Sequence, residues 1–338
     1  MISVGIVGAS GYTGEELIKI LLKHPEVKIQ SLTSRSHEGK NIKDVFKIDI
    51  SGVFKAPTLE NLSTCDVVFF ATPNGIAMNM ADDLIKNNIR IIDISADFRL
   101  SDVKVWEHWY GKSHACPSLL ADSVYGLPEI PNQKNKIKDA MIIANPGCYP
   151  TSSLLALLPI YESLPKQQVI IDAKSGISGA GRNLNSEKLF SEGEDNFQAY
   201  EVQTHRHYPE ILQVINNHNA DLDVLFVPHL SSIIRGIFTT LYIRMDYDNI
   251  NELITQYRSF YKDSPFVDVC DVDSFPKVSD VVLTNGCKIS LHKSVSDKGD
   301  INLVIFSVID NLIKGASGQA VQNMNIMFGL DEKTALDF

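Results

Sequence analysis

The feature that most constrains the fold is a glycine-rich stretch near the amino end of the chain. A buried-strand pattern, Ile2–Val7, runs into the glycine-rich turn Gly8-Ala9-Ser10-Gly11-Tyr12-Thr13-Gly14, and an amphipathic helix is expected over Gly14–Leu22. A glycine turn between a strand and a helix brings backbone N–H groups and the positive end of a helix dipole to one point, which suits a phosphate. The context therefore favours a dinucleotide-binding unit over a plain tight turn.

The rest of the chain shows two different patterns of apolar residues, one before and one after residue 150. Further short apolar runs that predict strands lie at 27–32, 66–71, 89–94 and 141–144. They alternate with helical stretches, which indicates an α/β fold with a parallel sheet covered on both faces. After residue 150, longer and partly alternating runs lie at 169–174, 223–227, 236–245 and 301–308, with a helix expected over 249–261. These favour an antiparallel sheet covered by helices on one face, in an α+β domain.

Bulk properties exclude several classes of protein. A chain of 338 residues exceeds one ordinary core, so two domains are expected. Its net charge of −10 argues against a nucleic-acid partner. We find no signal peptide and no apolar run of membrane-spanning length, so a cytoplasmic protein is expected. The five cysteines are widely spaced without a CxxC pair, which argues against a metal site or a disulfide framework and fits a reducing compartment.

The second strand indicates which dinucleotide is bound. It ends in Thr33-Ser34-Arg35-Ser36, with no acidic residue before Glu38 to accept from ribose hydroxyls. Ser34 and Arg35 can instead bind a 2′-phosphate, which favours NADP over NAD, unless Arg35 is only a solvated loop residue. The third strand runs into Thr72-Pro73-Asn74-Gly75, which places Pro73 at the carboxyl edge where ligands of such sheets bind.

One cysteine has the surroundings of a nucleophile. Cys148 lies in Asn145-Pro146-Gly147-Cys148-Tyr149-Pro150-Thr151, between the fifth strand and an apolar helix expected over 152–158. A helix amino terminus favours the reactive thiolate. Cysteines can also be buried, unreactive side chains, and Cys65, Cys270 and Cys287 fit that alternative. A nucleophilic thiol beside a nicotinamide nucleotide suggests reduction of an activated carboxyl group through a thioester.

Such chemistry needs a group that moves protons. Thr204-His205-Arg206-His207-Tyr208-Pro209-Glu210 offers two histidines, and the sequence does not decide which of them acts. A metal pair is disfavoured because no third ligand has suitable spacing. The donor-rich segment 174–182, KSGISGAGR, could approach a phosphate or the nicotinamide, although it could also be a plain connection.

Taken together and in order, these motifs resemble one family, the N-acetyl-γ-glutamyl-phosphate reductases. The matching segments are GASGYTGEEL (8–17), NPGCYPT (145–151), KSGISGAGR (174–182), HRHYPEI (205–211), PHL (228–230), RGI (235–237) and NLIKGASGQAVQNMN (311–325). They span nearly the whole chain. One departure is Gly286, in Thr284-Asn285-Gly286-Cys287, where the family would lead us to expect an arginine.

The resemblance implies a Rossmann-type NADP-binding domain formed by 1–147 and 313–338. It also implies an α+β catalytic and dimerisation domain at 148–312, as in glyceraldehyde-3-phosphate dehydrogenase, in a homodimer or homotetramer. By this resemblance Cys148 is the nucleophile, and His207 or His205 is the acid–base group. The NADP-binding residues that it implies are Gly8, Ser10, Gly11, Tyr12, Thr13, Ser178, Gly179 and Asn323. Ser34, Arg35 and Pro73 are added to them from their places at the strand ends. The residues expected to bind the substrate anion are Arg182, Arg235 and Ser175.

The implied reaction is the NADPH-dependent reduction of N-acetyl-γ-glutamyl phosphate to N-acetylglutamate γ-semialdehyde and phosphate, in arginine biosynthesis. Two alternatives stay open at this stage. One is the lysine-pathway reductase of α-aminoadipyl phosphate, and the other is a non-catalytic NADP-binding regulator. An acidic chain does not favour the first if its substrate sits on an acidic carrier protein, and Cys148 with both histidines would serve no purpose in the second.

Overall fold

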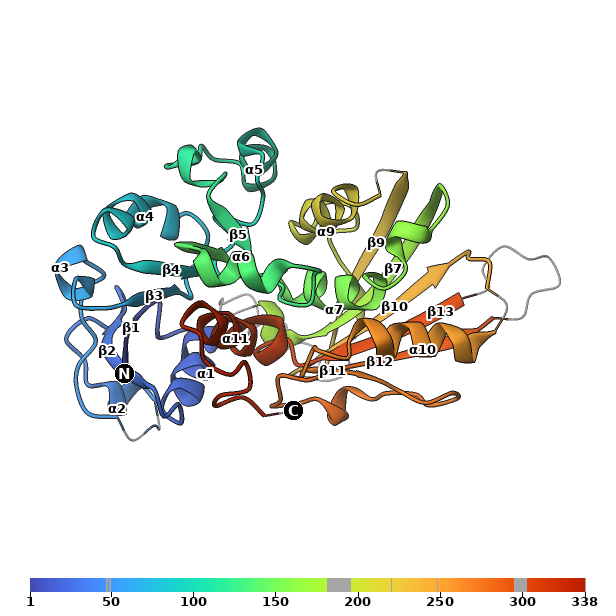
Figure 1. Cartoon of the computed structure of the whole chain (residues 1–338). Coiled ribbons are helices and arrows are strands. Elements are labelled where there is room, and N and C mark those ends of the chain that lie inside the picture. Colours follow the sequence, from blue (N-terminus) through green and yellow to red (C-terminus); the bar gives the residue numbers. More distant parts are fainter. Residues whose placement is uncertain are drawn as a thin grey trace. The chain divides into compact units, whose positions relative to one another are not determined.

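The computed structural model describes residues 1–46, 48, 50–180, 196–219, 221–247, 249–294 and 303–337 (Figure 1). They form two compact units. The first comprises Met1–Pro146 and Ala316–Leu336. The second comprises Gly147–Gly315 and the last residues of the chain. Each unit has its own sheet.

The first unit is built on a six-stranded sheet in which every described pairing is parallel. Its strands are β1 (Ile2–Val7), β2 (Val27–Thr33), β3 (Val67–Phe70), β4 (Arg90–Asp93), β5 (Ser123–Tyr125) and β6 (Ile142–Ala144). Their spatial order is β2-β1-β3-β4-β6-β5. The strands β3 and β6 are wholly apolar and buried, as expected where helices cover both faces of a parallel sheet.

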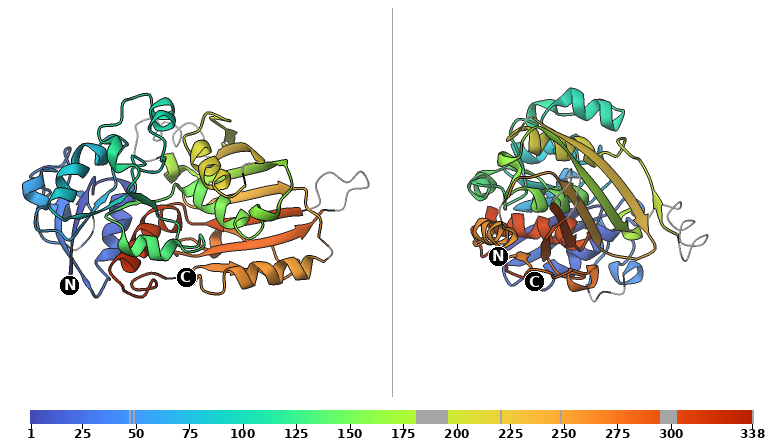
Figure 2. Two further views of the ribbon diagram at one scale, coloured as in Figure 1. Left: turned by 45° about the horizontal axis from the view of Figure 1, so that its top comes forward. Right: turned by 90° about the vertical axis from the view of Figure 1, so that its right-hand side faces the viewer.

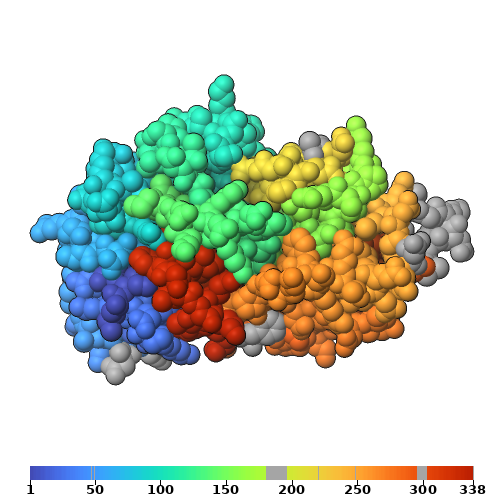
Figure 3. Space-filling view, in the orientation of Figure 1, coloured from blue at the N-terminus to red at the C-terminus, as the bar shows by residue number. Residues whose placement is uncertain are grey.

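The helices of the first unit are α1 (Tyr12–Leu21), α2 (Ile42–Val45), α3 (Leu59–Leu62), α4 (Ala77–Lys86), α5 (Val103–Tyr110), α6 (Gln133–Asp139) and α11 (Gly318–Met327). α11 comes from the end of the chain and packs between α1 and α6. The Ser317 hydroxyl, just before α11, donates to Thr13 O at 2.9 Å. In Figure 3 these last residues (red) lie next to the first ones (blue).

The second unit is built on a seven-stranded mixed sheet. Its strands are β7 (Gln167–Gly176), β8 (Gln198–Ala199), β9 (Leu222–Ser231), β10 (Ile237–Ile243), β11 (Val267–Val269), β12 (Cys287–Lys293) and β13 (Leu303–Ile309), in the order β11-β12-β13-β10-β7-β9-β8. α7 (Cys148–Leu157) lies against β10 and β13, and α10 (Ile250–Phe260) against β11 and β12. Figure 2 shows α10 (orange) running along these strands. The remaining long helix is α9 (His207–Asn216).

Most expected elements are confirmed, and one expectation about the second sheet is wrong. The runs at 2–7, 27–32, 66–71, 89–94 and 141–144 are strands of the first sheet. Those at 169–174, 223–227 and 236–245 form β7, β9 and β10, whereas residues 301–302 of the run 301–308 lie outside the described residues. The sheet is not purely antiparallel, because β7 pairs with β9 and β11 with β12 in parallel. α9 lies on the connection that returns the chain parallel to β7.

Gly236 provides a test of the second sheet. It precedes β10 with φ of +107°, and a side-chain carbon there would overlap Val278 Cγ1. We expect Gly236→Ala to destabilise the protein by more than about 2 kcal/mol, because a clash adds to the strain of a left-handed backbone. Urea unfolding measures this. The control is Gly111→Ala, whose φ is +66° with no atom within 4 Å, and which should cost only about 1 kcal/mol. Equal effects of the two substitutions would contradict the packing at Gly236.

Candidate functional site

The glycine turn after β1 is closed tightly against the end of β3. Gly8 has φ of +81°, and a side-chain carbon added there would lie 2.5 Å from Ala71 O. One added at Gly14 would lie 2.6 Å from Ala9 O. β1 and β3 are neighbours in the sheet, although β2 lies between them in sequence, so the turn lies where the strand order reverses. Ligands of open α/β sheets bind at such points.

Hydroxyl groups line the end of β2 beside this turn. Ser10 Oγ lies 3.0 Å from Ser34 Oγ, which in turn lies 3.3 Å from Ser36 Oγ. Ser34 is buried, whereas the next side chain, Arg35, is exposed. Gly11 precedes the first residue of α1, Tyr12, and offers no side chain to cap that helix. The turn and the end of β2 therefore present backbone, hydroxyl and guanidinium groups together.

The loop after β3 carries unsatisfied polar atoms. Thr72 Oγ1 and Asn74 Nδ2 are buried and have no hydrogen-bond partner among the residues that the structure describes. Pro73, between them, is exposed. Buried polar atoms are normally hydrogen-bonded, so an orphan pair at the carboxyl edge of the sheet suits a polar ligand.

The loop after β4 is braced by two buried carboxylates. Asp93 accepts from the N–H groups of Ser95 at 2.8 Å and Phe98 at 3.1 Å. Asp97 accepts from Gly75 N at 2.6 Å and from Met78 N at 3.0 Å. Burial, together with the neighbouring Asp97 carboxylate, raises the pKa of Asp93 above its ordinary range. Because both carboxylates accept from backbone N–H groups, Asp93 and Asp97 have a structural role in the loop after β4.

α11 brings Asn323 to the ends of β5 and β6. Its Nδ2 donates to Gly126 O at 2.9 Å and to Asn145 Oδ1 at 3.1 Å. Gly126 permits this approach, because a side-chain carbon there would lie 2.5 Å from Asn323 Nδ2. The other amide atom, Asn323 Oδ1, is buried without a hydrogen-bond partner in the described part of the chain.

Cys148 is the first residue of α7, as the sequence predicted, and backbone contacts hold it in place. The N–H of the preceding Gly147 donates to Glu210 Oε1 at 2.8 Å. On another side, a side-chain carbon added to Gly315 would lie 2.7 Å from Cys148 Cβ. Gly315 belongs to a π-helical turn, Ile313–Ser317, and such turns are frequent at functional sites. The sequence pointed to Glu210 only as the carboxylate that follows the two histidines, and it did not single out Gly315.

The His207 ring packs directly on Gly147. A side-chain carbon at Gly147 would fall on His207 Nε2 and within 2.7 Å of Cδ2. His207 begins α9, and Glu210 lies one turn later on the same helix. One helical turn therefore contacts Gly147 twice, through a ring against Cα and a carboxylate on the N–H group. The imidazole is thereby brought to the residue that precedes Cys148.

His205 occupies a different environment. Its Nδ1 accepts the His207 N–H at 3.0 Å, so the neutral ring carries its proton on Nε2. That atom lies 3.4 Å from the Tyr200 hydroxyl. Burial, with a smaller contribution from Arg206, lowers the pKa of His205 to about 4. The two histidines are therefore distinct. His205 is a largely buried, neutral ring that accepts from the backbone of its own loop, whereas His207 packs on the turn that carries Cys148.

Two tyrosines complete this cluster. The Tyr200 hydroxyl donates to the Tyr149 hydroxyl at 3.2 Å, and the Tyr149 hydroxyl donates to His229 O at 2.9 Å. The Tyr149 ring meets both histidine rings edge-on, with centroids 5.5 Å from His205 and 5.8 Å from His207. Burial raises the pKa of both tyrosines, which keeps them neutral hydrogen-bonding groups.

The segment after β7 lies partly within the described residues. The buried Ser175 hydroxyl donates to Gly176 O at 3.0 Å, and a side-chain carbon at Gly179 would lie 2.8 Å from Ser175 Oγ. Ser178 Oγ accepts from Asn311 Nδ2 at 3.0 Å. Arg182, expected at the substrate, lies outside the described residues.

Arg235 is paired within the protein. Its Nε lies 3.0 Å from Asp310 Oδ2 and its Nη2 lies 3.4 Å from Oδ1. Asp310 is fully buried and also accepts the N–H groups of Leu283 and Leu312 at 2.8 Å. The pair fixes the direction of the guanidinium, which sequence patterns could not reveal.

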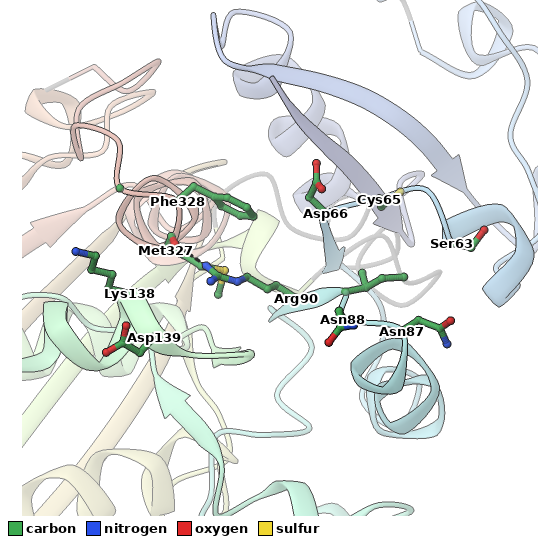
Figure 4. Close-up of a pocket in the computed structure, with 12 residues that line it drawn as sticks. Ser63, Cys65, Asp66, Asn87, Asn88, Arg90, Lys138, Asp139, Met327 and Phe328 are labelled. Atoms are coloured by element: carbon green, nitrogen blue, oxygen red, sulfur yellow. Dashed lines mark hydrogen bonds between the residues drawn. The ribbon is translucent and has the colours of Figure 1, made fainter.

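A separate hollow of about 610 Å³ lies at the opposite edge of the first sheet (Figure 4). It is lined by residues just before β3 and at the start of β4, and by the ends of α4, α6 and α11. Arg90 reaches across it to donate to Met327 O at 2.5 Å and lies 5.1 Å over the Phe328 ring. Because it is at the amino ends of the strands, this hollow is not the expected place for a dinucleotide.

The residues that the structure describes include no group of three His, Cys, Asp or Glu side chains that could hold a metal ion. Within the same residues, none of the helices has the length and apolar character needed to cross a membrane.

Comparison with known proteins identifies both halves of the chain. A family model described as the NAD binding domain of semialdehyde dehydrogenase matches residues 3–140. Another, described as the semialdehyde dehydrogenase dimerisation domain, matches residues 148–311. Among solved structures, aspartate semialdehyde dehydrogenase II of Vibrio cholerae, complexed with ASA, has a TM-score of 0.72 at 16% identity, covering 97% of this chain and 98% of that one. The aspartate semialdehyde dehydrogenase of Candida albicans, solved with NADP, scores 0.71 with the same identity and coverage. These matches confirm the predicted two-part fold.

Curated relatives are much closer in sequence. The N-acetyl-gamma-glutamyl-phosphate reductase of Nitrosospira multiformis is 49% identical over 346 residues, covering 99% of this chain and 98% of the relative. The proteins of the same name from Nitrosomonas europaea and Acinetobacter baumannii are 48% and 47% identical, with the same coverage.

The buried state of His205 predicts a pH dependence of stability. Its pKa is about 4 in the folded protein against an ordinary 6.5, so the unfolded chain binds the extra proton between these values. The contribution of His205 to the free energy of unfolding should therefore fall as the pH falls from 6.5 towards 4. Urea unfolding of the natural protein and of His205→Gln measures it. The difference in free energy of unfolding between the two proteins should be constant above pH 6.5. Below pH 6.5 the natural protein should lose stability relative to His205→Gln as the pH falls. A difference that does not depend on pH would contradict the proposed environment of His205.

Proposed function

The chain belongs to the N-acetyl-gamma-glutamyl-phosphate reductase family, and on that premise we propose that it reduces N-acetyl-γ-glutamyl phosphate with NADPH. The products are N-acetylglutamate γ-semialdehyde and inorganic phosphate, in the arginine pathway. The observation that carries this proposal is the contact of the His207 ring with Gly147, beside Cys148 at the start of α7. A nucleophile and a proton carrier are adjacent there, as acyl transfer to a thiol requires.

Cys148 acts as the nucleophile in this proposal. Its thiolate sulfur attacks the γ-carbonyl carbon of the acyl phosphate, a C–S bond forms, and the C–O bond to phosphate breaks. The amino end of α7 favours the thiolate. NADPH, when bound, supplies a hydride to the thioester carbon. The resulting hemithioacetal oxyanion takes a proton and then loses it as the aldehyde forms and the thiolate leaves.

His207 is the group that moves this proton. It packs on Gly147, whereas His205 is neutral, buried and bonded to the backbone of its own loop. We therefore assign the acid–base role to His207 and a positioning role to His205. Glu210 holds the Gly147 N–H group and so fixes the turn that carries Cys148.

NADP(H) fits the carboxyl edge of the first sheet. We propose that the Gly8–Thr13 turn binds the pyrophosphate at the start of α1. Ser34 and Arg35 would bind the 2′-phosphate, since the sequence has no acidic residue at this point to accept hydrogen bonds from the ribose hydroxyls. The orphan atoms of Thr72 and Asn74, beside Pro73, agree with a polar ligand along this edge. Ser178, Gly179 and Asn323 are assigned to the nicotinamide half.

For the substrate we propose Ser175, Arg182 and Arg235. Arg235 is held by the buried Asp310 carboxylate, which leaves it a fixed cation rather than a mobile one. A guanidinium of fixed direction suits a carboxylate or phosphate of one substrate length. The first unit then binds the dinucleotide, and the second carries the catalytic groups.

We also propose that two copies associate through the second sheet. Opposite α7 and α10 its strands present partly exposed aromatic side chains, including Phe238 and Phe306. Phe275 is 66% exposed and stacks on His292, with ring centroids 4.5 Å apart. Exposed aromatic patches mark interaction surfaces. The expected species is a homodimer, working in the cytoplasm.

The reverse reaction tests the function directly. With N-acetylglutamate γ-semialdehyde, phosphate and NADP⁺, the protein should produce NADPH only when phosphate is present. Cys148→Ser should abolish the signal, and His207→Gln should lower it by at least about 100-fold, the usual contribution of general acid–base catalysis. Absorbance of NADPH follows the reaction.

Two parallel reactions separate the alternatives. The homologous aminoadipate semialdehyde should be turned over poorly, and a preference for it would move the protein to the lysine pathway. A folded protein that binds NADPH but reduces NADP⁺ with neither aldehyde would support a non-catalytic regulator and contradict the proposal.

A further inference from the structure

Three large apolar side chains of the second unit are exposed in the two segments that hold the Arg235 guanidinium. Ile233 is 42% exposed and Ile234 is 64% exposed, and they immediately precede Arg235. Leu283 is 62% exposed. Its N–H donates at 2.8 Å to Asp310 Oδ2, the atom that lies 3.0 Å from Arg235 Nε. We call Ile233, Ile234 and Leu283 the apolar rim of Arg235.

The two segments of the apolar rim are fixed against each other and against the end of β7. A side-chain carbon at Gly236 would overlap Val278 Cγ1, so the segment before β10 touches the one that leads to Leu283. The Ser178 N–H donates to Ile234 O at 3.1 Å. Since Ser178 is assigned to the nicotinamide half of the cofactor, the apolar rim borders the site proposed for the substrate.

Leu283 has an unfavourable backbone conformation. Its φ is +66°, a left-handed value in which a leucine is strained and a glycine is not. Val281 and Asn285, on either side of it, are buried, and the Thr284 N–H donates to Val281 O at 3.1 Å, so the surroundings impose this conformation. The chain thus carries a large apolar side chain, mostly exposed, at a strained position. Such strain concentrates at functional sites, and exposed apolar surface beside a charge is typical of binding sites.

The chemistry of the apolar rim matches one end of the proposed substrate. N-acetyl-γ-glutamyl phosphate carries its α-carboxylate and its acetylated nitrogen on the same carbon atom, far from the γ-carbonyl that Cys148 attacks. A fixed guanidinium suits the carboxylate. An apolar side chain next to that guanidinium suits the acetyl methyl group. A free amino acid would instead place an ammonium group against this apolar surface, which is unfavourable.

We propose that Leu283 contacts the acetyl methyl group of the substrate while Arg235 binds its α-carboxylate. This rests on the proposed function, because it takes an N-acetylated acyl phosphate as the substrate. Leu283 is then a specificity-determining residue that selects the acyl group on the amino nitrogen. It takes no part in the thioester chemistry at Cys148.

Two aldehydes that differ only in this methyl group test the inference. The reverse reaction would be measured with N-acetylglutamate γ-semialdehyde and with its N-formyl analogue, at saturating phosphate and NADP⁺. The natural protein should show kcat/KM about fivefold higher for the N-acetyl aldehyde, the difference expected when one methyl group is covered. Leu283→Gly should reduce this preference to less than about twofold. The loss should appear as a higher KM for the N-acetyl aldehyde and not as a lower kcat.

Melting temperatures and a matched control separate this role from a purely structural one. Leu283→Gly removes the backbone strain and should therefore maintain or raise the melting temperature. Ala335→Gly relieves the same kind of strain in the first unit, at φ of +61°, and should keep the natural preference between the aldehydes. Leu283→Asn is a second variant, since asparagine adopts left-handed backbone readily but is polar. It should also lose the preference.

The outcomes distinguish this inference from the proposed function. If the natural protein oxidises both aldehydes equally well, or if both Leu283 variants keep the preference, the inference fails and the function stands. Equal losses with the two aldehydes would assign Leu283 to the fold alone. Dissociation of Leu283→Gly into monomers on size-exclusion chromatography, with the preference intact, would assign the apolar rim to a contact between copies. If the natural protein oxidises neither aldehyde, both the function and the inference fail.

Discussion

The contact between the His207 ring and Gly147 is the interaction on which the candidate catalytic site depends. Only a residue without a side chain lets an imidazole lie against the backbone immediately before Cys148. Glu210, one turn further along α9, fixes the same residue through its N–H group. Gly315 closes on Cys148 from another segment of the chain. The turn that carries the nucleophile is therefore fixed by a side-chain bond to the Gly147 N–H group and by close backbone packing at Gly147 and Gly315.

A second constraint is the polarity of α11. The helix is buried along its whole length, although it carries Gln319, Gln322, Asn323 and Asn325. Gln322 and Asn325 find partners within the protein, as when Asn325 Oδ1 meets His24 Nε2 at 2.9 Å. The unsatisfied atoms of Gln319 and Asn323 stand out against this background. Burying these atoms without partners in the described part of the chain carries an energetic cost, which the bonded amides of the same helix avoid.

Much of this arrangement could be predicted from the sequence because its signals are local. Apolar runs separated by helical stretches identify the parallel sheet, and the Pro-Gly-Cys turn before an apolar helix places Cys148 at its start. What was missed depends on segments distant in sequence. Glu210 meets Gly147 across 63 residues and Asp310 meets Arg235 across 75 residues, and no spacing rule connects them. The parallel pairing of β7 with β9 follows from the path of the connection, not from the alternation within either strand.

The claim at the centre is that the acyl group passes through a thioester on Cys148, and trapping that thioester tests it most directly. N-acetyl-γ-glutamyl phosphate, made in place by a kinase, would be mixed with the protein without NADPH, quenched in acid and analysed by mass spectrometry. The account predicts an N-acetylglutamyl adduct on the peptide containing Cys148, released by neutral hydroxylamine and absent from Cys148→Ala. An active protein that shows no adduct, or carries it on another residue, would contradict the account.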